Sequence, residues 1–451
     1  MSGSNPGQRL ALSMFIFAAV GGVLYGYDLG IIAGALLFVK KAIPMTLQEE
    51  SFFVAAVLGG GAIATLISGT LSDWFGRRRM IMVASLFFLA GVYFVANAHS
   101  YASVLIGRLV QGIGVGIITI AVPLYLAESL PASIRGRGVS AFQLLLTAGI
   151  LLASLIGLYF TPSGNWRGMF ISAAVPGIVM MIGCFFLSDS PRWLVMHGKD
   201  EKALNVLEKT RAKADAKKEL IAIKKAISDS KCGKSGKKIS VWQKRFMLPL
   251  FIVVSAACLQ QLTGVNSILQ FSAVILKDSG LHANILAMLG STAITGLNFA
   301  VTVLVLYLMS RIGRRGLLTV GTMGMVIALT YCGLIFYFLE PCLCKGYLLL
   351  FGILLFIFSY AFGPGTLIWL VLAELLPSRI RGWGMAFALF MNSMVSTGFA
   401  SIYLGLVHKL GYQGVFWISA FCAFLYFLLV LKMVPETKGK TLEEIEGYFN
   451  K

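Results

Sequence analysis

Two stretches of the chain carry the same pattern. Ala127–Gly138 reads Ala-Glu-Ser-Leu-Pro-Ala-Ser-Ile-Arg-Gly-Arg-Gly, and Ala373–Gly384 reads Ala-Glu-Leu-Leu-Pro-Ser-Arg-Ile-Arg-Gly-Trp-Gly, 373 − 127 = 246 residues further on. Gly76-Arg77-Arg78 recurs as Gly313-Arg314-Arg315 with nearly the same displacement, 313 − 76 = 237 residues. Two unrelated motifs that share almost one offset indicate a tandem duplication.

The composition places both copies in a membrane. Of the 451 residues, 58% are hydrophobic and 13% are charged, whereas a soluble domain has about a quarter of its residues charged. Apolar runs of about 20 residues, the length of a helix that crosses a bilayer, recur along the whole chain. The net charge of +19 could suggest nucleic acid, but the positive charges lie in short loops on one side of these runs. We therefore expect a membrane protein without a nucleic-acid partner.

The apolar runs predict about twelve membrane-spanning helices in two sets of six. The first set covers roughly 10–38, 51–72, 80–97, 103–127, 138–160 and 168–188, and the second covers roughly 247–276, 285–309, 317–339, 346–374, 384–408 and 414–434. A polar segment separates the sets. We therefore expect an all-α protein with an N-terminal half over 1–188, a basic helical linker over 189–246, a C-terminal half over 247–434 and a tail over 435–451.

Lysine and arginine gather on one side of the predicted spans. Arg77–Arg79, the linker and Arg311–Arg315 all fall there, while the opposite loops carry scattered charges. The positive-inside rule predicts that this side, with both termini, faces the cytoplasm, and that the chain lies in the plasma (inner) membrane. The linker is interpreted as a solvated tether between the halves, and binding to anionic lipid headgroups is the alternative.

The sequence offers no pattern for catalysis or for metal binding. The four histidines are isolated, and neither a metal-ligand spacing, a phosphate loop nor a nucleophile–base pair is present in it. Cys342 and Cys344 share one outer loop, but nothing requires them to be oxidised. We therefore expect neither an enzyme nor a bound cofactor or metal.

Asp28 lies inside the first predicted span. A carboxylate within a membrane helix is costly unless it faces a cavity or a partner, so it indicates function by default. Arg108, near the start of the fourth predicted span, lies at a similar depth. We expect the two side chains to pair and, as the pair opens and closes, to exchange a proton. A static structural pair is the alternative.

Amide side chains also lie inside the spans. Each amide donates and accepts hydrogen bonds, as sugar hydroxyls do, and Phe362 and Trp369 offer apolar faces for a sugar ring. A helix–helix hydrogen bond is the alternative for each amide taken singly. Their concentration in the fifth, seventh and eighth spans favours a ligand site. The amides are Gln143, Gln260, Gln261, Asn266, Asn298 and Asn392.

The chain resembles the sugar porters of the major facilitator superfamily over nearly its whole length. Single motifs of this family are weak, but here they occur together and in order. They are Gly69-x-x-x-Asp73-x-x-Gly76-Arg77-Arg78-Arg79, Gly107-Arg108, Pro123-x-Tyr125-x-x-Glu128, Ser190-Pro191-Arg192, Gln260-Gln261-x-x-Gly264-x-Asn266, Gly363-Pro364-Gly365 with Trp369, and Pro435-Glu436-Thr437-Lys438-Gly439. Bacterial proton-coupled xylose and hexose symporters and facilitative glucose carriers are the members that it resembles.

The resemblance implies two pseudo-symmetric six-helix halves that give alternating access to a central site. It also implies that Gln143, Gln260, Gln261, Asn266, Asn298 and Trp369 contact the sugar, and we expect Gly365 and Asn392 to belong to the same site. Proton-coupled members carry an aspartate at the position of Asp28 with an arginine matching Arg108, whereas facilitative carriers are neutral at the first position. A carboxylate can carry a proton and an amide cannot, so Asp28 favours coupling.

Three positions depart from the family pattern. Gln270-Phe271 stand where paired tyrosines are common, and Leu389 stands where the eleventh span often has a tryptophan. Ser310 replaces an aspartate that is usual in the second-half loop. The first two departures bear on substrate identity and outer gating, and the third bears on how firmly the second half locks.

Charged residues at the cytoplasmic helix ends predict an inner gate. Opposite charges there can bridge neighbouring helices when the inner side is closed, and a partly buried network biases two states that differ by a few kcal/mol. A role in topology alone is the alternative, because arginine also enforces orientation. The predicted gate residues are Asp73, Arg77, Glu128, Arg135, Arg311, Glu374 and Arg381.

Together these features predict a monomeric, proton-coupled symporter for a pentose or hexose. Its expected partners are the monosaccharide, protons and the lipid bilayer. A facilitative uniporter of the same fold is the first alternative. A sugar sensor that does not transport is the second, although such receptors tend to have long cytoplasmic extensions and this tail is short.

Overall fold

The computed structural model describes residues 6–232, 244–309, 311–377 and 380–438, together with Glu444 and Tyr448, and every regular element in these residues is a helix. The N half consists of α1 (Pro6–Ala42), α2 (Leu47–Phe75), α3 (Arg77–Ala96), α4 (Tyr101–Ser129), α5 (Ala132–Phe160), α6 (Trp166–Ser172) and α7 (Ala174–Phe186). The C half consists of α11 (Lys244–Leu262), α12 (Val265–Asp278), α13 (Asn284–Leu308), α14 (Arg314–Phe338), α15 (Leu343–Phe362), α16 (Pro364–Leu375) and α17 (Arg381–Met433).

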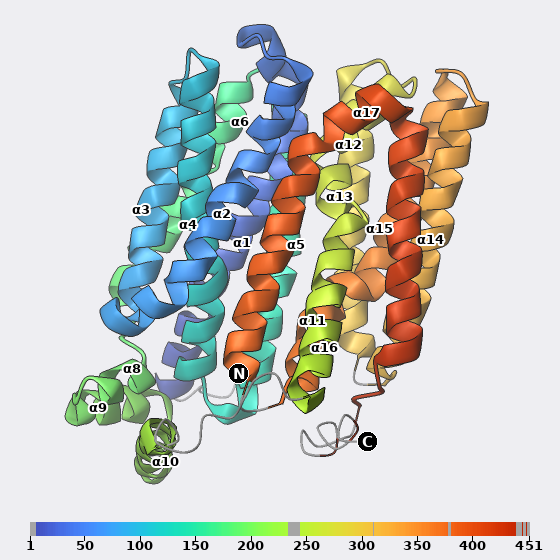
Figure 1. Cartoon of the computed structure of the whole chain (residues 1–451). Helices are drawn as coiled ribbons and strands as arrows, with labels where there is room; N and C mark the ends of the chain where they lie inside the picture. Colours follow the sequence, from blue (N-terminus) through green and yellow to red (C-terminus); the bar gives the residue numbers. More distant parts are fainter. Residues whose placement is uncertain are drawn as a thin grey trace, which may run out of the picture.

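Twelve membrane crossings follow from these helices. Eleven apolar helical runs are long enough to span a bilayer, and the last of them, Arg381–Met433, has 53 residues. At 1.5 Å per residue it would be about 80 Å long, against a hydrocarbon core of about 30 Å. It turns back at Gly411, whose φ of 69° is outside the helical range, and Figure 1 shows α17 bending there. The predicted all-α fold with about twelve spans is therefore confirmed.

Three other crossings are broken rather than straight. α6 meets α7 at Ala173, α11 meets α12 at Gly264, and α15 meets α16 at Gly363-Pro364. Gly264 has a φ of 78°, in the left-handed region that glycine tolerates best. Breaks of this kind free backbone groups inside a membrane protein only where they line a cavity or pack against protein. Two of the three lie in the C half, next to its predicted amides.

Glycines let α1 pack closely on α5. A β-carbon at Gly26 would overlap the carbonyl group of Leu146, and one at Gly30 would lie 2.6 Å from the carbonyl oxygen of Ile150. Small residues allow membrane helices to approach in this way, where dispersion contacts rather than hydrophobic expulsion hold them together. The tight α1–α5 packing fixes the helix that carries Asp28.

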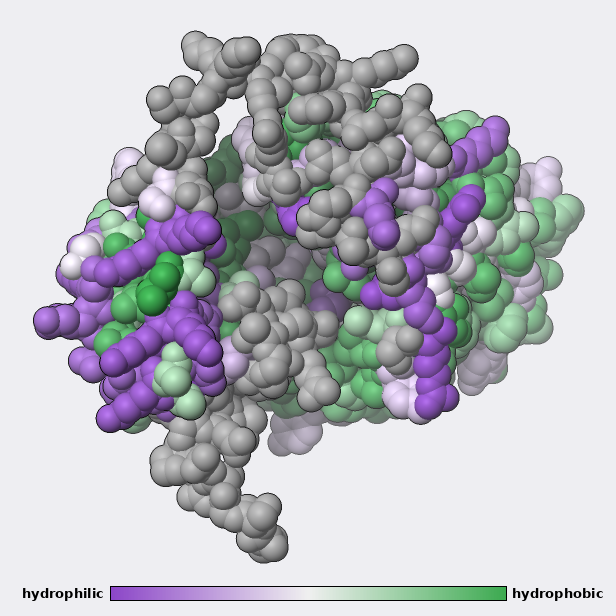
Figure 2. All heavy atoms as spheres, turned by 90° about the horizontal axis from the view of Figure 1, so that it is seen from below, coloured by the Kyte–Doolittle hydropathy of each residue, from purple (hydrophilic) through white to green (hydrophobic). Residues whose placement is uncertain are grey.

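The two halves lie side by side, and the start of α1 and the end of α17 lie at one face, here called the termini face (Figure 1). Toward the opposite face, called the far face, hydrogen bonds join the halves: Gln48 Nε2 donates to the Ser401 carbonyl at 3.1 Å, and Leu404 N donates to Ser51 Oγ at 3.2 Å. Ser154 and Thr292 bond across the same seam at 3.0 Å. The termini face is hollowed between the halves (Figure 2). The structure is therefore closed at the far face and open at the termini face.

A lobe of three helices lies under the N half at the termini face (Figure 1). It contains α8 (Pro191–Met196), α9 (Asp200–Thr210) and α10 (Lys213–Cys232). Trp193 attaches it to the bundle: its indole N–H donates to the Asp73 carbonyl at 3.1 Å, and its ring packs where a β-carbon on Gly76 would fall 3.1 Å away. The φ of 93° at Gly76 suits glycine as well. This contact links the lobe to the helix end that carries the first charged motif.

Candidate functional site

A buried ion pair lies in the N half. Arg108 Nη1 of α4 donates to Asp28 Oδ1 of α1 at 2.8 Å, and both side chains are fully buried. Two aromatic rings flank the guanidinium group, whose Cζ atom lies 5.8 Å from the ring of Phe53 and 5.5 Å from that of Phe170. The predicted pairing of Asp28 with Arg108 is thus what the structure contains. Its role in coupling stays a prediction.

One neighbour of this pair was not predicted from the sequence. Gln111, also fully buried, accepts a hydrogen bond from Arg108 Nη1 at 3.1 Å through its Oε1 atom. Gln111 lies three residues after Arg108, so both side chains lie on one face of α4. Helical spacing was therefore a signal for this contact, but the sequence alone could not show which face of α4 meets α1.

The amides of the C half form one connected hydrogen-bond network. Gln261 Nε2 donates to Asn392 Oδ1 at 3.2 Å, and Asn266 Nδ2 donates to Gln261 Oε1 at 2.9 Å. Asn392 Nδ2 donates in turn to Gln260 Oε1 at 3.3 Å and to the Ala257 carbonyl at 2.8 Å. Four predicted site residues, from α11, α12 and α17, therefore meet. Because their donors and acceptors bond to one another, an entering polyol can take over these bonds group for group.

A small cavity of about 50 Å³ lies beside this network and between the halves. Gln261, Asn266 and Asn392 line its C-half wall, and Tyr25 of α1 lines its N-half wall. Ser396, one turn beyond Asn392, also lines it and accepts from Asn266 Nδ2 at 2.9 Å. Tyr25 and Ser396 were not predicted from the sequence as site residues, although Tyr25 lies three residues before Asp28. Three members of the amide network and the helix that carries Asp28 therefore line the same cavity.

Three other predicted residues lie around this centre without joining the network. Gln143 Nε2 of α5 donates to the Gly365 carbonyl of α16 at 3.4 Å, a bond that crosses between the halves. Asn298 is buried on α13, and its carbonyl accepts from Thr302 Oγ1 at 2.8 Å. Trp369 is partly buried against the C-half core. The structure therefore brings Gln143 and Gly365 together, and within the described residues Asn298 and Trp369 make no hydrogen bond to the amide network.

The positions that depart from the family pattern have distinct environments. Phe271 stacks on Tyr403 with ring centroids 5.0 Å apart and an interplanar angle of 9°. Gln270 is buried, and neither its amide nitrogen nor its oxygen has a hydrogen-bond partner among the described residues. Leu389 is partly buried on α17, and Ser310 lies outside the described residues. An aromatic contact near the far face is thus kept by Phe271, while Gln270 leaves a buried amide unpaired.

The charged motif of the N half is a compact network. Arg77 Nη2 lies 2.7 Å from Asp73 Oδ1 and 2.9 Å from Glu128 Oε1, and Arg77 is 3% exposed. Ser190 Oγ donates to Glu128 Oε2, which ties the start of α8 into the same network. All of these residues belong to the N half or its lobe. The network therefore holds while the termini face is open.

The predicted gate residues of the C half are arranged differently. Arg381 donates from Nε and Nη2 to the Leu376 carbonyl at 3.2 and 3.0 Å, and Arg311 donates to the Tyr307 hydroxyl at 2.7 Å. Glu374 has a buried Oε2 atom without a hydrogen-bond partner in the described part of the chain. The side chain of Arg135 lies outside the described residues. Bridging of neighbouring helices by these charges stays a prediction for the closed state.

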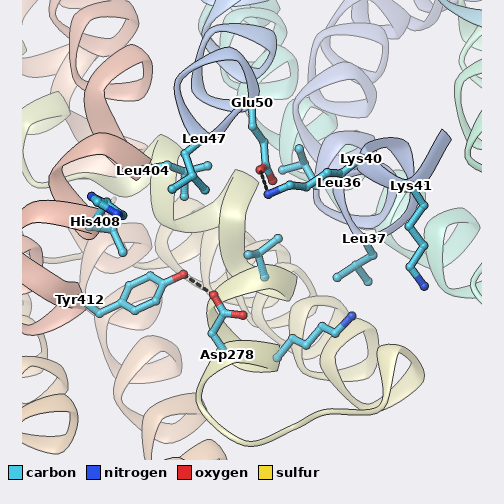
Figure 3. Close-up of a pocket in the computed structure, with 13 residues that line it drawn as sticks. Leu36, Leu37, Lys40, Lys41, Leu47, Glu50, Asp278, Leu404, His408 and Tyr412 are labelled. Carbon is cyan, nitrogen blue, oxygen red and sulfur yellow. Dashed lines mark hydrogen bonds and ion pairs between the residues drawn. The ribbon is translucent and has the colours of Figure 1, made fainter. Parts of the chain in front are cut away.

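A larger pocket of about 480 Å³ lies at the far face, between the halves (Figure 3). On its N-half side Lys40 Nζ lies 3.3 Å from Glu50 Oε2, and on its C-half side the Tyr412 hydroxyl donates to Asp278 Oδ2 at 2.8 Å. Each polar pair stays within one half. The pocket shares no lining residue with the central cavity, so it belongs to the closed far-face seam rather than to the amide site.

A bundle of twelve crossings in two halves, with a buried ion pair and a polar centre reached from one face, defines a membrane transporter. Residues 14–449 match the family model described as Sugar (and other) transporter. The glucose transporter GlcP of Staphylococcus epidermidis is 34% identical over 435 residues, which cover 96% of each chain. The galactose-proton symporter of Escherichia coli strain K12 is 32% identical over 440 residues, 97% of this chain and 94% of that one.

The fold is also found among solved structures. The inward-open conformation of the xylose transporter XylE from E. coli matches with a TM-score of 0.83 and 26% identity, over 97% of this chain and 99% of that one. The protein therefore belongs to the sugar transporter family and has the major facilitator fold. It is a multi-pass membrane transporter and not an enzyme.

Proposed function

We propose that the protein is a proton-coupled monosaccharide symporter that carries a pentose or hexose together with a proton carried by Asp28. The observation that carries this proposal is the fully buried Asp28–Arg108 pair, on a helix that also lines the central cavity through Tyr25. Burying a carboxylate inside a membrane protein is costly, so such a residue indicates a function. The relatives named above include a galactose-proton symporter, which supports coupling in this chain as well.

The sugar site in this proposal is the amide network and its surroundings. Gln260, Gln261, Asn266 and Asn392 form its C-half wall, and Gln143 reaches the backbone of Gly365 from the N half. Amides match hydroxyls as donors and acceptors, and Trp369 supplies an aromatic face for the ring's C–H side. Asn298 is proposed to complete the site from α13.

Coupling follows from the charge of Asp28. When water reaches Asp28 from the acidic side, protonation removes its charge and weakens its attraction to Arg108. A neutral acid costs less to enclose in protein than an ionised one. Sugar binding then favours closure, and the opposite state returns the proton to the more alkaline compartment. The proton gradient thereby drives sugar against its own gradient.

We also propose which face of the protein lies in the cytoplasm and which partners it has. The termini face carries most of the Lys and Arg and is assigned to the cytoplasm of the plasma membrane, so the structure is inward-facing. The basic lobe of α8–α10 belongs to the segment 189–246, interpreted as a cytoplasmic tether. The partners are a monosaccharide, protons and lipid, with the single chain as the working unit.

Asp28→Asn tests the coupling proposal because it fixes the neutral form permanently. We expect it to abolish accumulation driven by an imposed pH gradient while it retains sugar binding and sugar-preloaded counterflow. Proteoliposomes prepared in both ways, with D-glucose, D-galactose and D-xylose as labelled probes, provide the measurement. Gradient-driven accumulation by this variant at the wild-type level would place the proton elsewhere or make the protein a uniporter.

Gln261→Ala tests the sugar site. Removing one amide takes away the donor that Gln261 supplies to Asn392 Oδ1 and leaves sugar hydroxyls unpaired, and we expect binding to weaken by about 1–3 kcal/mol. Trp369→Ala should weaken it as well through loss of the ring face. Calorimetry with the sugar that the wild type prefers measures both. If neither substitution changes the affinity, the sugar does not bind at this network.

A further inference from the structure

Gln111 shares a donor with the coupling pair. Arg108 Nη1 donates to Asp28 Oδ1 at 2.8 Å and to Gln111 Oε1 at 3.1 Å, so one nitrogen serves two acceptors. All three side chains are fully buried. Asp28 Oδ2, Arg108 Nε and Nη2, and Gln111 Nε2 have no hydrogen-bond partner within the described residues. The cluster is therefore sparingly hydrogen-bonded, and each acceptor of Arg108 counts.

The position of Gln111 is fixed by packing. A β-carbon at Gly91 of α3 would lie 2.5 Å from Gln111 Cγ, so the absence of a side chain at Gly91 leaves the space that Gln111 occupies. Side chains of an α-helix lean toward its N-terminus, which directs Gln111 back toward Arg108, three residues earlier. Gly91 and the helix geometry together hold the amide against the guanidinium group.

Among the described residues, the charges of this cluster are those of Asp28 and Arg108. Arg108 is the charged group that acts on Asp28 among the described residues. Tyr25 and Tyr27 are the titratable neighbours on α1 itself, and Tyr27 bonds to Ser172 of α6 at 2.6 Å. α2 and α6 present the rings of Phe53 and Phe170 to Arg108. Gln111 is therefore the neutral side chain that can hold the Arg108 cation when Asp28 loses its charge.

We infer that Gln111 is a positioning residue that keeps Arg108 hydrogen-bonded while Asp28 is protonated, and so sets the external pH at which coupling begins. Protonation of Asp28 leaves Arg108 as a buried cation without a counter-ion, which is a costly arrangement. A hydrogen bond from the charged Arg108 guanidinium group to Gln111 Oε1 lowers that cost. Without this hydrogen bond, the ionised form of Asp28 is favoured more strongly, and a more acidic external pH is needed to protonate it. This inference rests on the proposed role of Asp28.

Two substitutions at one position separate this role from simple packing. Gln111→Leu keeps the volume and removes the acceptor, and we expect half-maximal gradient-driven uptake at an external pH about one unit more acidic. Gln111→Glu gives Arg108 a second carboxylate and adds a like charge near Asp28, so the shift should be toward alkaline pH. A purely structural role would impair both variants without opposite shifts.

A matched control is present in the chain. Gln270 is also a buried glutamine with an unpaired amide, but it lies on α12 of the C half. Gln270→Leu changes a position that bears on outer gating, so only its pH dependence is compared, and the pH of half-maximal uptake should stay unchanged. Counterflow of preloaded sugar is measured for every variant, so that a folded and binding-competent protein is established without the proton gradient.

The experiment measures initial uptake into proteoliposomes over a range of external pH at constant internal pH. The probe is whichever of D-glucose, D-galactose and D-xylose the wild type accumulates best. Opposite shifts for Gln111→Leu and Gln111→Glu support the inference. Wild-type profiles, or shifts in the same direction, overturn it when Asp28→Asn has lost accumulation. If Asp28→Asn still accumulates sugar, the proposed coupling itself fails, which distinguishes the two results.

Discussion

The termini-face ends of the two halves come from one repeated pattern and have different structures. In the N half, Glu128 accepts from Arg77 at 2.9 Å and from Ser190, and Arg77 also pairs with Asp73 at 2.7 Å. The C-half equivalent of Glu128 is Glu374, since 128 + 246 = 374. Its buried Oε2 atom has no hydrogen-bond partner among the described residues.

The C half uses a carboxylate from its tail instead. Glu436 accepts from the backbone N–H of Arg314 at 2.9 Å and of Arg315 at 3.1 Å, at the start of α14. A carboxylate at this place satisfies free amides and faces the positive end of the helix dipole. Lys438 of the same tail donates to the Arg311 carbonyl at 2.7 Å. Side chains of the tail therefore hold the C-half loop in place by hydrogen bonds to the backbone of the loop.

The difference shows what duplication preserves and what it does not. Both copies keep the helix ends and the Glu–Arg pattern, but only the N half has an acid at the position of Asp73, where the C half has Ser310. The two ion pairs of Arg77 in the N-half network are formed while the termini face is open. Glu374 Oε2 has no hydrogen-bond partner among the described residues in this open state. Closure of the termini face is the event that could supply one.

Removing the charge of each equivalent glutamate tests the difference between the two halves most directly. Glu128→Gln leaves the buried Arg77 with one carboxylate fewer, and we expect a loss of stability of about 2–3 kcal/mol. Glu374→Gln removes no hydrogen bond that Glu374 makes to the described residues in the open structure, so its effect should stay below about 0.5 kcal/mol. Thermal unfolding in detergent compares the two midpoints. Equal losses for both variants would mean that the halves are locked alike.

Removing the tail carboxylate tests the C-half arrangement. Glu436→Gln replaces two charge-assisted bonds to backbone amides with weaker ones, and we expect a loss of about 1–2 kcal/mol. Glu436→Asp retains the charge but is one methylene shorter, so it should fall between this variant and the wild type. Hydrogen exchange at the N-terminus of α14 measures the effect locally. Unchanged exchange in Glu436→Gln would show that the tail contributes nothing to that helix end.

The sequence predicted the parts of this comparison that depend on composition and order. Bilayer length fixes how many apolar residues a span needs, so the twelve crossings could be counted, including the break between 408 and 414 where Gly411 lies. The depth of Asp28 and Arg108 followed from the direction of their helices. Repeated motifs located both sets of helix ends.

The contacts themselves depend on which helix faces meet. Gln261 and Asn392 are 131 residues apart, and their bond exists because α11 and α17 pack together. The contacts of Glu436 with Arg314 and of Gln111 with Arg108 were not predicted, although Glu436 lies within a quoted motif and Gln111 lies three residues after one. Spacing along one helix gives neighbours within it, but it does not give the rotation of that helix against another. The unequal use of Glu128 and Glu374 was hidden for the same reason.

The last prediction concerns Arg381, one of the predicted gate residues of the C half. In the open structure Arg381 bonds to the Leu376 carbonyl and not to Glu374. If it pairs with Glu374 when the termini face closes, Arg381→Ala favours the open state by about 1 kcal/mol, or about fivefold. Glu374→Gln should then shift the same equilibrium in the same direction.

A cysteine introduced at Ser393, which lines the central cavity, reports this equilibrium. In a background without the native cysteines, maleimide should label it faster from the termini face in both Arg381→Ala and Glu374→Gln. Arg381→Lys keeps the charge and serves as the control, with labelling close to the wild-type rate. If Arg381 only caps the end of α16, Arg381→Ala lowers the unfolding midpoint and leaves labelling unchanged. That result would leave Glu374 without this partner in either state and would confine the charge network of the termini face to the N half.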